Sequence, residues 1–233
     1  MPYKIIFLLL TFLWFSNAKS KELVACIDDH PPYQIIAEKP HGIHISALEV
    51  LADVLKKELK FIQSPNFARC VAFLKQGKVD VIAGLNSSGE RDEFSFYAPF
   101  KAADDLRVIS KEGIVIKNYD DFHGKIIGIS RGTSYFPRFD KDNELKKIAI
   151  QNSRIGFTLL LKNRIDLIMV SPATIETLSK ELNDANLIVS PIQLSEMRNK
   201  ETAFGFSKSH KLGLTNKEII EKVQAAYKQG LFE

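Results

Sequence analysis

The sequence lacks the features that mark several classes of protein. It contains no run of five or more like charges, and 32 basic against 28 acidic side chains leave a formal net charge of only +4. Such a balance gives no electrostatic footprint for binding nucleic acid. The sequence also has no G-x-S-x-G elbow, no H-E-x-x-H pair and no Walker loop. We therefore expect neither an enzyme nor a protein with a nucleic-acid partner.

The composition is that of a globular protein, with 45% hydrophobic and 26% charged residues in a chain of 233. These proportions exclude a disordered, collagen-like or coiled-coil chain. The length is enough for one large domain or two small lobes, since domains usually contain roughly 100 to 200 residues.

The N-terminus carries the single long apolar run, Ile5–Phe15, which follows the basic Lys4 and precedes the small residues Ser16–Ala18. This run is too short to cross a membrane, because a transmembrane helix needs about 20 residues. We interpret residues 1–18 as a secretory signal peptide and expect an exported protein. A lipoprotein cleavage box at Leu23–Cys26 is the alternative, although such a box directly follows the apolar segment and Lys19–Glu22 intervene here.

Cysteine is scarce, and Cys26 and Cys70 are the only two in the chain. An even number of cysteines in an exported protein favours a disulfide. Closing that loop would contribute roughly 4 kcal/mol in the chain-entropy model. The alternative is a pair of buried free thiols.

Apolar and turn residues predict two successive βαβαβ units of parallel strands joined by right-handed crossovers. In the first unit we expect strand Leu23–Ile27, a loop over Asp28–Tyr33, a helix opened by a capping box at Ser46 and Glu49 and ending near Leu59, helix Phe67–Gln76 and strand Val79–Ala83. In the second we expect strands Lys125–Ser130 and Lys147–Ile150, helix Ile155–Lys162 and strand Asp166–Val170.

A local repeat supports the two units. Residues Leu74–Ile82 align without gaps on Leu160–Ile168, and Gly77 matches Asn163 at the end of each helix. Both residue types suit the left-handed turn that ends a helix. Chance similarity between two ordinary turns is the alternative.

The chain that follows the second unit, a segment near Lys200–Ser207 and a helix over Asn216–Gln229, is too short for a domain. We expect it to return to the first unit, with two crossings near Phe100–Val108 and Lys200–Phe204. The predicted division is therefore a signal peptide (1–18), a discontinuous lobe 1 (19–103 and 204–233) and lobe 2 (104–203). A ligand would bind in the cleft between the lobes.

The motifs, taken in order, resemble those of the bacterial periplasmic solute-binding proteins of the type-3 family, the substrate-binding proteins of amino-acid ABC transporters. The resemblance covers the whole chain after the signal. It rests on Asp28–Tyr33, Gly42, Leu74–Asp80, Glu90–Arg91, Phe94–Phe100, Gly124–Gly128, Gly132–Thr133 and Phe204–Lys208. It implies an α/β, two-lobed periplasmic-binding-protein fold of type II, in which each lobe is a βαβαβ sheet flanked by helices.

The resemblance also implies a ligand site. Arg91 corresponds to the arginine that holds a ligand carboxylate, and a guanidinium matches a carboxylate with two parallel hydrogen bonds. Asn86 and Ser87 from lobe 1, and Thr133 and Ser134 from lobe 2, can add polar donors. The expected walls of the site are Tyr33, Phe67 and Arg69, with His30 as a further candidate.

One position departs from the family pattern. Ser171 stands where amino-acid-binding members have an acidic residue that pairs with the ligand ammonium. A hydroxyl cannot supply that ion pair. Either Asp28, Asp29 or Glu196 substitutes, or the ligand is a small carboxylate or anion other than a standard amino acid.

We thus expect a monomeric periplasmic protein that captures a small polar, carboxylate-bearing solute by hinge closure and delivers it to an ABC-type permease, with no cofactor and no metal. The alternatives on the same fold are a dehydratase-like enzyme and a periplasmic sensor. A metal site made by His41, His44 and Asp28–His30 is a further alternative.

Overall fold

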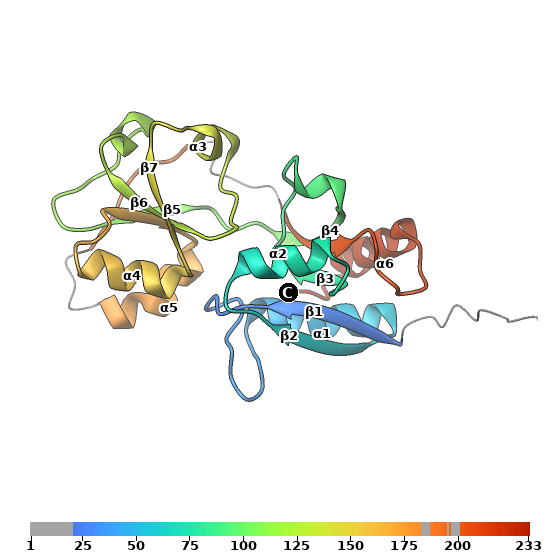
Figure 1. Cartoon of the computed structure of the whole chain (residues 1–233). Helices are drawn as coiled ribbons and strands as arrows, with labels where there is room; N and C mark the ends of the chain where they lie inside the picture. Colours follow the sequence, from blue (N-terminus) through green and yellow to red (C-terminus); the bar gives the residue numbers. More distant parts are fainter. Residues whose placement is uncertain (1–20, 183–186, 195, 197–200) are drawn as a thin grey trace, which may run out of the picture.

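A computed structural model describes residues 21–182, 187–194, 196 and 201–233. The predicted signal peptide lies outside these residues, as does Lys200 at the second expected crossing. The described chain forms two five-stranded sheets, one in each of two lobes that lie next to each other (Figure 1).

The first sheet has the order β2-β1-β3-β10-β4. Strand β1 pairs in parallel with β2 and β3, whereas β10 runs antiparallel to β3 and β4. The elements of this lobe are β1 (Glu22–Ile27), α1 (Ile43–Leu55), β2 (Glu58–Gln63), α2 (Phe67–Lys75), β3 (Val81–Ala83), the short helix η1 (Arg91–Glu93), β4 (Ser95–Ala102), β10 (Glu201–Ser207) and α6 (Asn216–Lys228).

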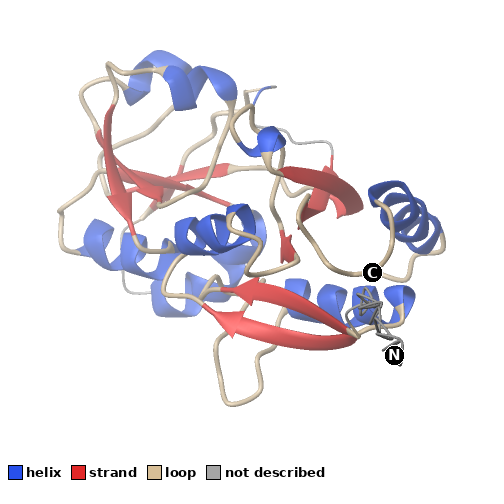
Figure 2. Ribbon diagram, turned by 45° about the vertical axis from the view of Figure 1, so that its right-hand side comes forward, coloured by secondary structure: helices blue, strands red, loops and turns tan. Residues whose placement is uncertain are grey.

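The second sheet has the order β7-β6-β8-β5-β9, which repeats the pattern of the first. Strand β6 pairs in parallel with β7 and β8, and β5 runs antiparallel to β8 and β9. The elements are β5 (Arg107–Ser110), η2 (Tyr119–Phe122), β6 (Ile126–Ser130), α3 (Pro137–Lys141), β7 (Lys146–Ile150), α4 (Ser153–Leu161), β8 (Leu167–Val170), α5 (Pro172–Leu182) and β9 (Ile188–Val189). Figure 2 shows the helices packed around the strands of both sheets.

The two predicted units of parallel strands are therefore present, although β2 begins at Glu58, where the first helix was predicted to continue to about Leu59. Each unit is extended by two further strands, which run antiparallel to their neighbours in the sheet. Strand β10 completes the first sheet, as expected for a chain that returns to its first unit. Among the described residues, no helix is long and apolar enough to cross a membrane.

The start of α1 corrects a prediction. The helix begins at Ile43 after Gly42 rather than at a capping box of Ser46 and Glu49, and it ends at Leu55 because Lys56 adopts a left-handed conformation with φ 54°. The backbone N–H groups of Ile43 and His44 donate to carbonyls of the preceding loop at 3.2 and 2.8 Å. Main-chain carbonyls thus accept hydrogen bonds from the first N–H groups of the helix, the role predicted for a serine side chain.

The repeated turn is confirmed. Gly77 and Asn163 both have left-handed backbones, with φ of 65° and 53°. Three residues later, the Asp80 carboxylate accepts from the N–H of Val24 at 2.9 Å, and the Asp166 carboxylate accepts from that of Ile126 at 2.7 Å. Each aspartate thereby ties the strand that it precedes to the first strand of its unit.

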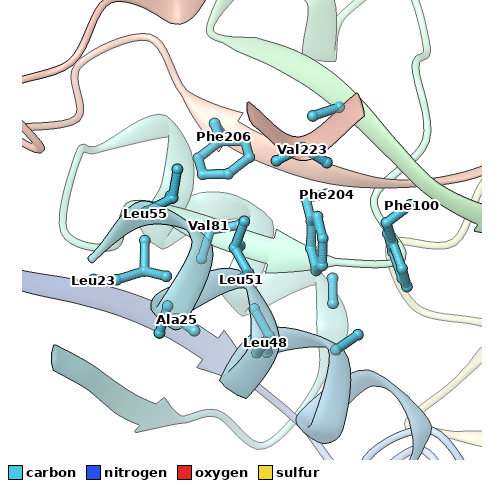
Figure 3. Close-up of a cluster of buried hydrophobic side chains, with 14 of the residues drawn as sticks. Leu23, Ala25, Leu48, Leu51, Leu55, Val81, Phe100, Phe204, Phe206 and Val223 are labelled. Carbon is cyan, nitrogen blue, oxygen red and sulfur yellow. The ribbon is translucent and has the colours of Figure 1, made fainter. Parts of the chain in front are cut away.

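Buried clusters of apolar side chains form the core of each lobe. In the first lobe, leucines of α1 pack against β1, β3 and the phenylalanines of β4 and β10 (Figure 3). The rings of Phe100 and Phe204 are stacked with centroids 4.0 Å apart. Cys26 and Cys70 form a disulfide that joins β1 to α2 in the interior, so the predicted pairing is confirmed.

Candidate functional site

A cavity of about 140 Å³ lies between the two lobes, where several parallel strands end. Apart from His44 in α1 and Arg91 in η1, the polar residues that face it lie at or after the carboxyl ends of strands, the usual place for a ligand in open α/β sheets. We call this space the cleft cavity. Its lining is Asp28, His30, Gln34, His44, Phe67, Ala83, Gly84, Asn86 and Arg91 from the first lobe, and Ser130, Thr133, Ser134, Gln151 and Asn152 from the second.

Arg91 reaches across the cleft from η1. Its Nη1 donates to the Asn86 carbonyl at 3.2 Å, its Nη2 donates to the Gly132 carbonyl of the second lobe, and its guanidinium lies 5.9 Å from the Phe67 ring. Partial burial lowers the pKa of Arg91, although the group stays charged at any physiological pH. A guanidinium has five N–H donors, so the cleft cavity holds a fixed cation with donors beyond these two contacts.

Most of the predicted site residues are brought together around this cation. Asn86, Phe67, Thr133 and Ser134 line the cleft cavity with Arg91. The Ser134 hydroxyl donates to Asp140 at 2.6 Å, which fixes its orientation.

Two predicted site residues lie elsewhere. Ser87 donates to the Asp92 carboxylate at 2.9 Å and faces an adjoining hollow instead of the cleft cavity. Arg69 is exposed on α2, with its guanidinium 5.3 Å from the Phe73 ring. Arg69 covers the helix surface because its position on α2 directs it away from the cleft.

Tyr33 and Ser171 line a second hollow that shares His30, His44, Asn86 and Thr133 with the cleft cavity. The Tyr33 hydroxyl lies 2.6 Å from the Asp104 carboxylate and 2.8 Å from the Ser171 hydroxyl. Since the carboxylate can only accept, Tyr33 donates to Asp104 and accepts from Ser171. Burial and the Asp104 acceptor raise the pKa of Tyr33, which keeps the hydroxyl protonated.

Ser171 also serves its own lobe. Its hydroxyl accepts from the N–H of Thr174 at 3.2 Å in the first turn of α5. The serine therefore caps a helix and contacts Tyr33, and it contributes no charge to the cleft.

Asp28 supplies a carboxyl group to the cleft cavity. Its side chain is only 3% exposed, and burial, with a smaller contribution from Asp29, raises the pKa of Asp28 to about 6. Of the two other acids considered from the sequence, Asp29 lies 3.5 Å from the Asn152 amide, and Glu196 faces the adjoining hollow near Ser87. Asp28 is thus the acid placed in the same cavity as Arg91.

His30 and His44 are neutral wall residues. Burial lowers the pKa of His30 to about 4; burial, the neighbouring His30 and Lys101 lower the pKa of His44 to about 3. His44 was not among the predicted ligand contacts, and neither were Gln34, Gln151, Asn152 and Asp104, which also line the cleft. Asn152 carries a recognisable signal, because it follows a strand and caps the helix α4.

The metal site considered from the sequence is not assembled. His41 is exposed and does not line the cleft cavity. Within the part of the chain that the structure describes, the group of three metal-ligating side chains that comes together is His123, Asp142 and Glu144, on the second lobe.

The family model of the bacterial extracellular solute-binding proteins, family 3, matches residues 23–228. The chain belongs to this family. This solute-binding protein is similar to an ancestral arginine-binding protein bound to arginine, with a TM-score of 0.75, 21% identity and coverage of 92% of this chain and 96% of the other. No match is found among curated proteins.

Two further solved structures share the fold. For holo ArgBP from T. maritima the TM-score is 0.72, with 20% identity and coverage of 91% of each chain. The GluR0 ligand-binding core from Nostoc punctiforme in complex with L-glutamate has a TM-score of 0.72, with 15% identity and coverage of 90% of this chain and 95% of the other. At these identities the likeness establishes the two-lobed fold, and the expected fold class is confirmed.

Proposed function

We propose that this solute-binding protein captures a small polar solute that carries a carboxylate, an amino acid or a related compound, between its lobes for import by an ABC-type permease. The observation that carries the proposal is the Arg91 guanidinium in a cavity lined by both lobes. A half-buried permanent cation with directed donors favours a carboxylate, and bidentate pairing adds orientation.

The hydroxyl group of Thr133 supports the same end of the ligand, whereas the Ser134 hydroxyl already donates its proton to Asp140. Thr133 follows β6, lines the cavity and belongs to the lobe opposite Arg91. A carboxylate between Thr133 and Arg91 would accept from both lobes at once. Its binding would then depend on the lobes being together.

Asp28 is the partner that we propose for a ligand ammonium. It shares the cavity with Arg91 and, within the described chain, forms no ion pair. Its raised pKa reflects burial without a compensating cation. An α-amino acid would place its carboxylate at Arg91 and its ammonium at Asp28, which would replace the acid missing at Ser171.

Hinge closure is the proposed mechanism. The lobes touch through Gln151, which donates to the Pro65 carbonyl at 3.0 Å, through Thr174 and the Pro31 carbonyl at 3.4 Å, and through Arg91 and Gly132. A ligand that contacts both lobes binds the closed state preferentially and increases its population. The hinge would lie where the chain passes from lobe 1 (19–103 and 204–233) to lobe 2 (104–203).

The proposal also covers the location of the protein and its partner. We propose a periplasmic, monomeric protein that presents its closed form to a permease in the inner membrane. Membership of a family of extracellular solute-binding proteins supports export.

A thermal-shift screen of the purified protein against the 20 common L-amino acids and small carboxylates tests the ligand class. A compound that binds only the folded protein raises the melting temperature. We expect a shift with at least one carboxylate-bearing solute, its loss in Arg91→Gln, and its persistence in Arg164→Gln, a matched change at an exposed arginine. A shift that Arg91→Gln leaves intact would overturn the site, and stabilisation only by compounds without a carboxylate would overturn the ligand class.

A further inference from the structure

His44 carries two polar atoms that the fold leaves unsatisfied. The residue lies in the first turn of α1 with its side chain 7% exposed. Its Nδ1 and Nε2 are the buried side-chain polar atoms without a hydrogen-bond partner in the described part of the chain. Native proteins satisfy nearly all such groups, so an orphaned imidazole at a ligand cavity calls for an explanation.

The two aromatic rings that pack against the imidazole do not hydrogen-bond its nitrogens. Tyr33 and Phe100 lie against the ring, with centroids 4.7 and 5.9 Å away. The Tyr33 hydroxyl is engaged by Asp104 and Ser171, and a phenylalanine ring has no polar atom. The aromatic neighbours fix the position of the imidazole without using its nitrogens.

The nitrogen-bearing edge of the ring faces the wall of the cleft at Gly84. A Cβ atom at Gly84 would lie 2.6 Å from Cε1, the carbon between the two nitrogens, and 3.2 Å from Nδ1. Gly84 and His44 both line the cleft cavity and the second hollow. Glycine at this position therefore leaves room for the imidazole edge beside the ligand space.

We propose that His44 is a specificity-determining residue, which hydrogen-bonds an uncharged polar group of the ligand, a hydroxyl or a carboxamide, in addition to the carboxylate held by Arg91. This inference rests on the proposed function and narrows its ligand class to polar, uncharged amino acids and close relatives.

The chemistry of a neutral imidazole selects that group. One nitrogen donates and the other accepts, and hydroxyl and carboxamide groups likewise both donate and accept. A cationic group could use only the accepting nitrogen, and an anionic group could use only the donating nitrogen, so neither would satisfy both nitrogens of the ring.

The test is calorimetric titration with matched pairs of amino acids, in which one member has the polar group and the other lacks it. The pairs are L-serine with L-alanine, L-threonine with L-2-aminobutyrate, and L-glutamine with L-norvaline. A site built to bond a polar group rejects the analogue that lacks it. For at least one pair we expect the wild-type protein to prefer the polar member by about tenfold or more.

The variants assign that preference to His44. In His44→Leu the ratio within the pair should fall to about one, through weaker binding of the polar member. His44→Gln, which keeps a donor and an acceptor, should retain part of the preference. His41→Leu, at an exposed histidine of the same lobe, should bind as the wild type does. A wild-type protein without preference, or a preference that survives His44→Leu, would overturn the inference.

A second measurement covers variants that fail to fold. In the wild-type protein, the imidazole nitrogen resonances of His44 should shift on addition of the preferred amino acid, because a hydrogen bond to either nitrogen changes its shielding. Binding that depends on Arg91 but leaves these resonances in place would overturn the role of His44 and spare the proposed function. Binding of no amino acid or carboxylate would overturn both.

Discussion

Tyr33 and Ser171 join the two lobes through their hydroxyl groups, whose oxygens lie 2.8 Å apart. Ser171 stands where the resemblance to the family leads one to expect an acid that pairs with a ligand ammonium. Here the position is used by the protein itself, because Ser171 caps α5 and contacts Tyr33, which in turn donates to Asp104. The contact between Tyr33 and Ser171 is neutral, and we infer that the charge opposite the ligand ammonium is supplied by Asp28.

Removing the Tyr33 hydroxyl should weaken that contact. Tyr33→Phe is expected to lower the stability of the protein by roughly 1 kcal/mol, the net contribution of a typical hydrogen bond, and to enlarge the radius of gyration in solution scattering without ligand. Tyr227→Phe, on α6 away from the cleft, is the control. Equal behaviour of the two variants would show that the Tyr33 hydroxyl does not hold the lobes together.

Asp28 should make the protein less stable at neutral pH than at low pH. Its pKa in the folded protein is about 6, above its ordinary value of 3.8, so the folded state binds a proton more tightly than the unfolded state. Stability from this group is therefore lost as pH rises from about 4 to about 6. Asp28→Asn should stabilise the ligand-free protein at pH 7.5 by up to about 3 kcal/mol, at roughly 1.4 kcal/mol per pKa unit, and by nothing at pH 3.5.

Urea denaturation at the two pH values measures this difference, with Asp53→Asn on the exposed side of α1 as the control. The same variant should bind amino acids more weakly at pH 7.5, because the partner of the ammonium is lost. A variant that is destabilised at pH 7.5 would show that Asp28 is stabilised as a charged group in the folded protein.

The sequence predicts the fold correctly where the residue types of a short segment are enough to determine its local conformation. The two turns at Gly77 and Asn163 could be matched because left-handed conformations restrict the residue type and because the following aspartates repeat at the same spacing. The beginning of α1 could not be found in this way. Its first N–H groups are satisfied by carbonyls from Pro32 and Tyr33, and such partners exist only after the loop has folded onto the helix.

The sequence likewise predicts some residues of the candidate site and misses others. Arg91, Asn86 and Thr133 follow strands in polar loops, so their types and places already suggest a cleft. The sequence does not single out His44 as a residue of the cleft, because a histidine on the apolar face of a helix resembles a core residue, and its lack of a partner is visible only in three dimensions.

Asp80 and Asp166, which occupy equivalent positions in the two lobes, should each stabilise their own lobe. Asp166 accepts from the Ile126 N–H at 2.7 Å and pairs with Lys111 at 2.6 Å. Although partial burial raises it, these partners bring the pKa of Asp166 below its ordinary value. Asp166→Ala should therefore lower the stability by about 1 to 3 kcal/mol above pH 4, and the difference should disappear as pH falls through the lowered pKa.

Asp80→Ala should have a similar effect in the other lobe, because its carboxylate accepts from Val24 at 2.9 Å. Urea midpoints at pH 7 measure both variants. Unchanged midpoints would mean that water replaces these carboxylates without loss.

Gly132 gives a direct test of closure. In this structure a Cβ atom at Gly132 would lie 2.6 Å from Cα of Ala68 on the opposite lobe, whereas nothing lies within 4 Å of a Cβ atom at Gly113. The two glycines have nearly the same backbone, with φ of 86° and 80°. Both alanine variants should thus lose about 1 to 2 kcal/mol from the left-handed conformation, and only Gly132→Ala should also meet the other lobe.

We therefore expect Gly132→Ala to bind the solute at least about tenfold more weakly than Gly113→Ala, since a ligand cannot close lobes that clash. In solution scattering, the radius of gyration of Gly113→Ala should decrease when ligand is added, and that of Gly132→Ala should stay at its ligand-free value. If Gly132→Ala closes and binds as Gly113→Ala does, the contact with Ala68 is not part of the ligand-bound state, and capture must proceed through a different arrangement of the lobes.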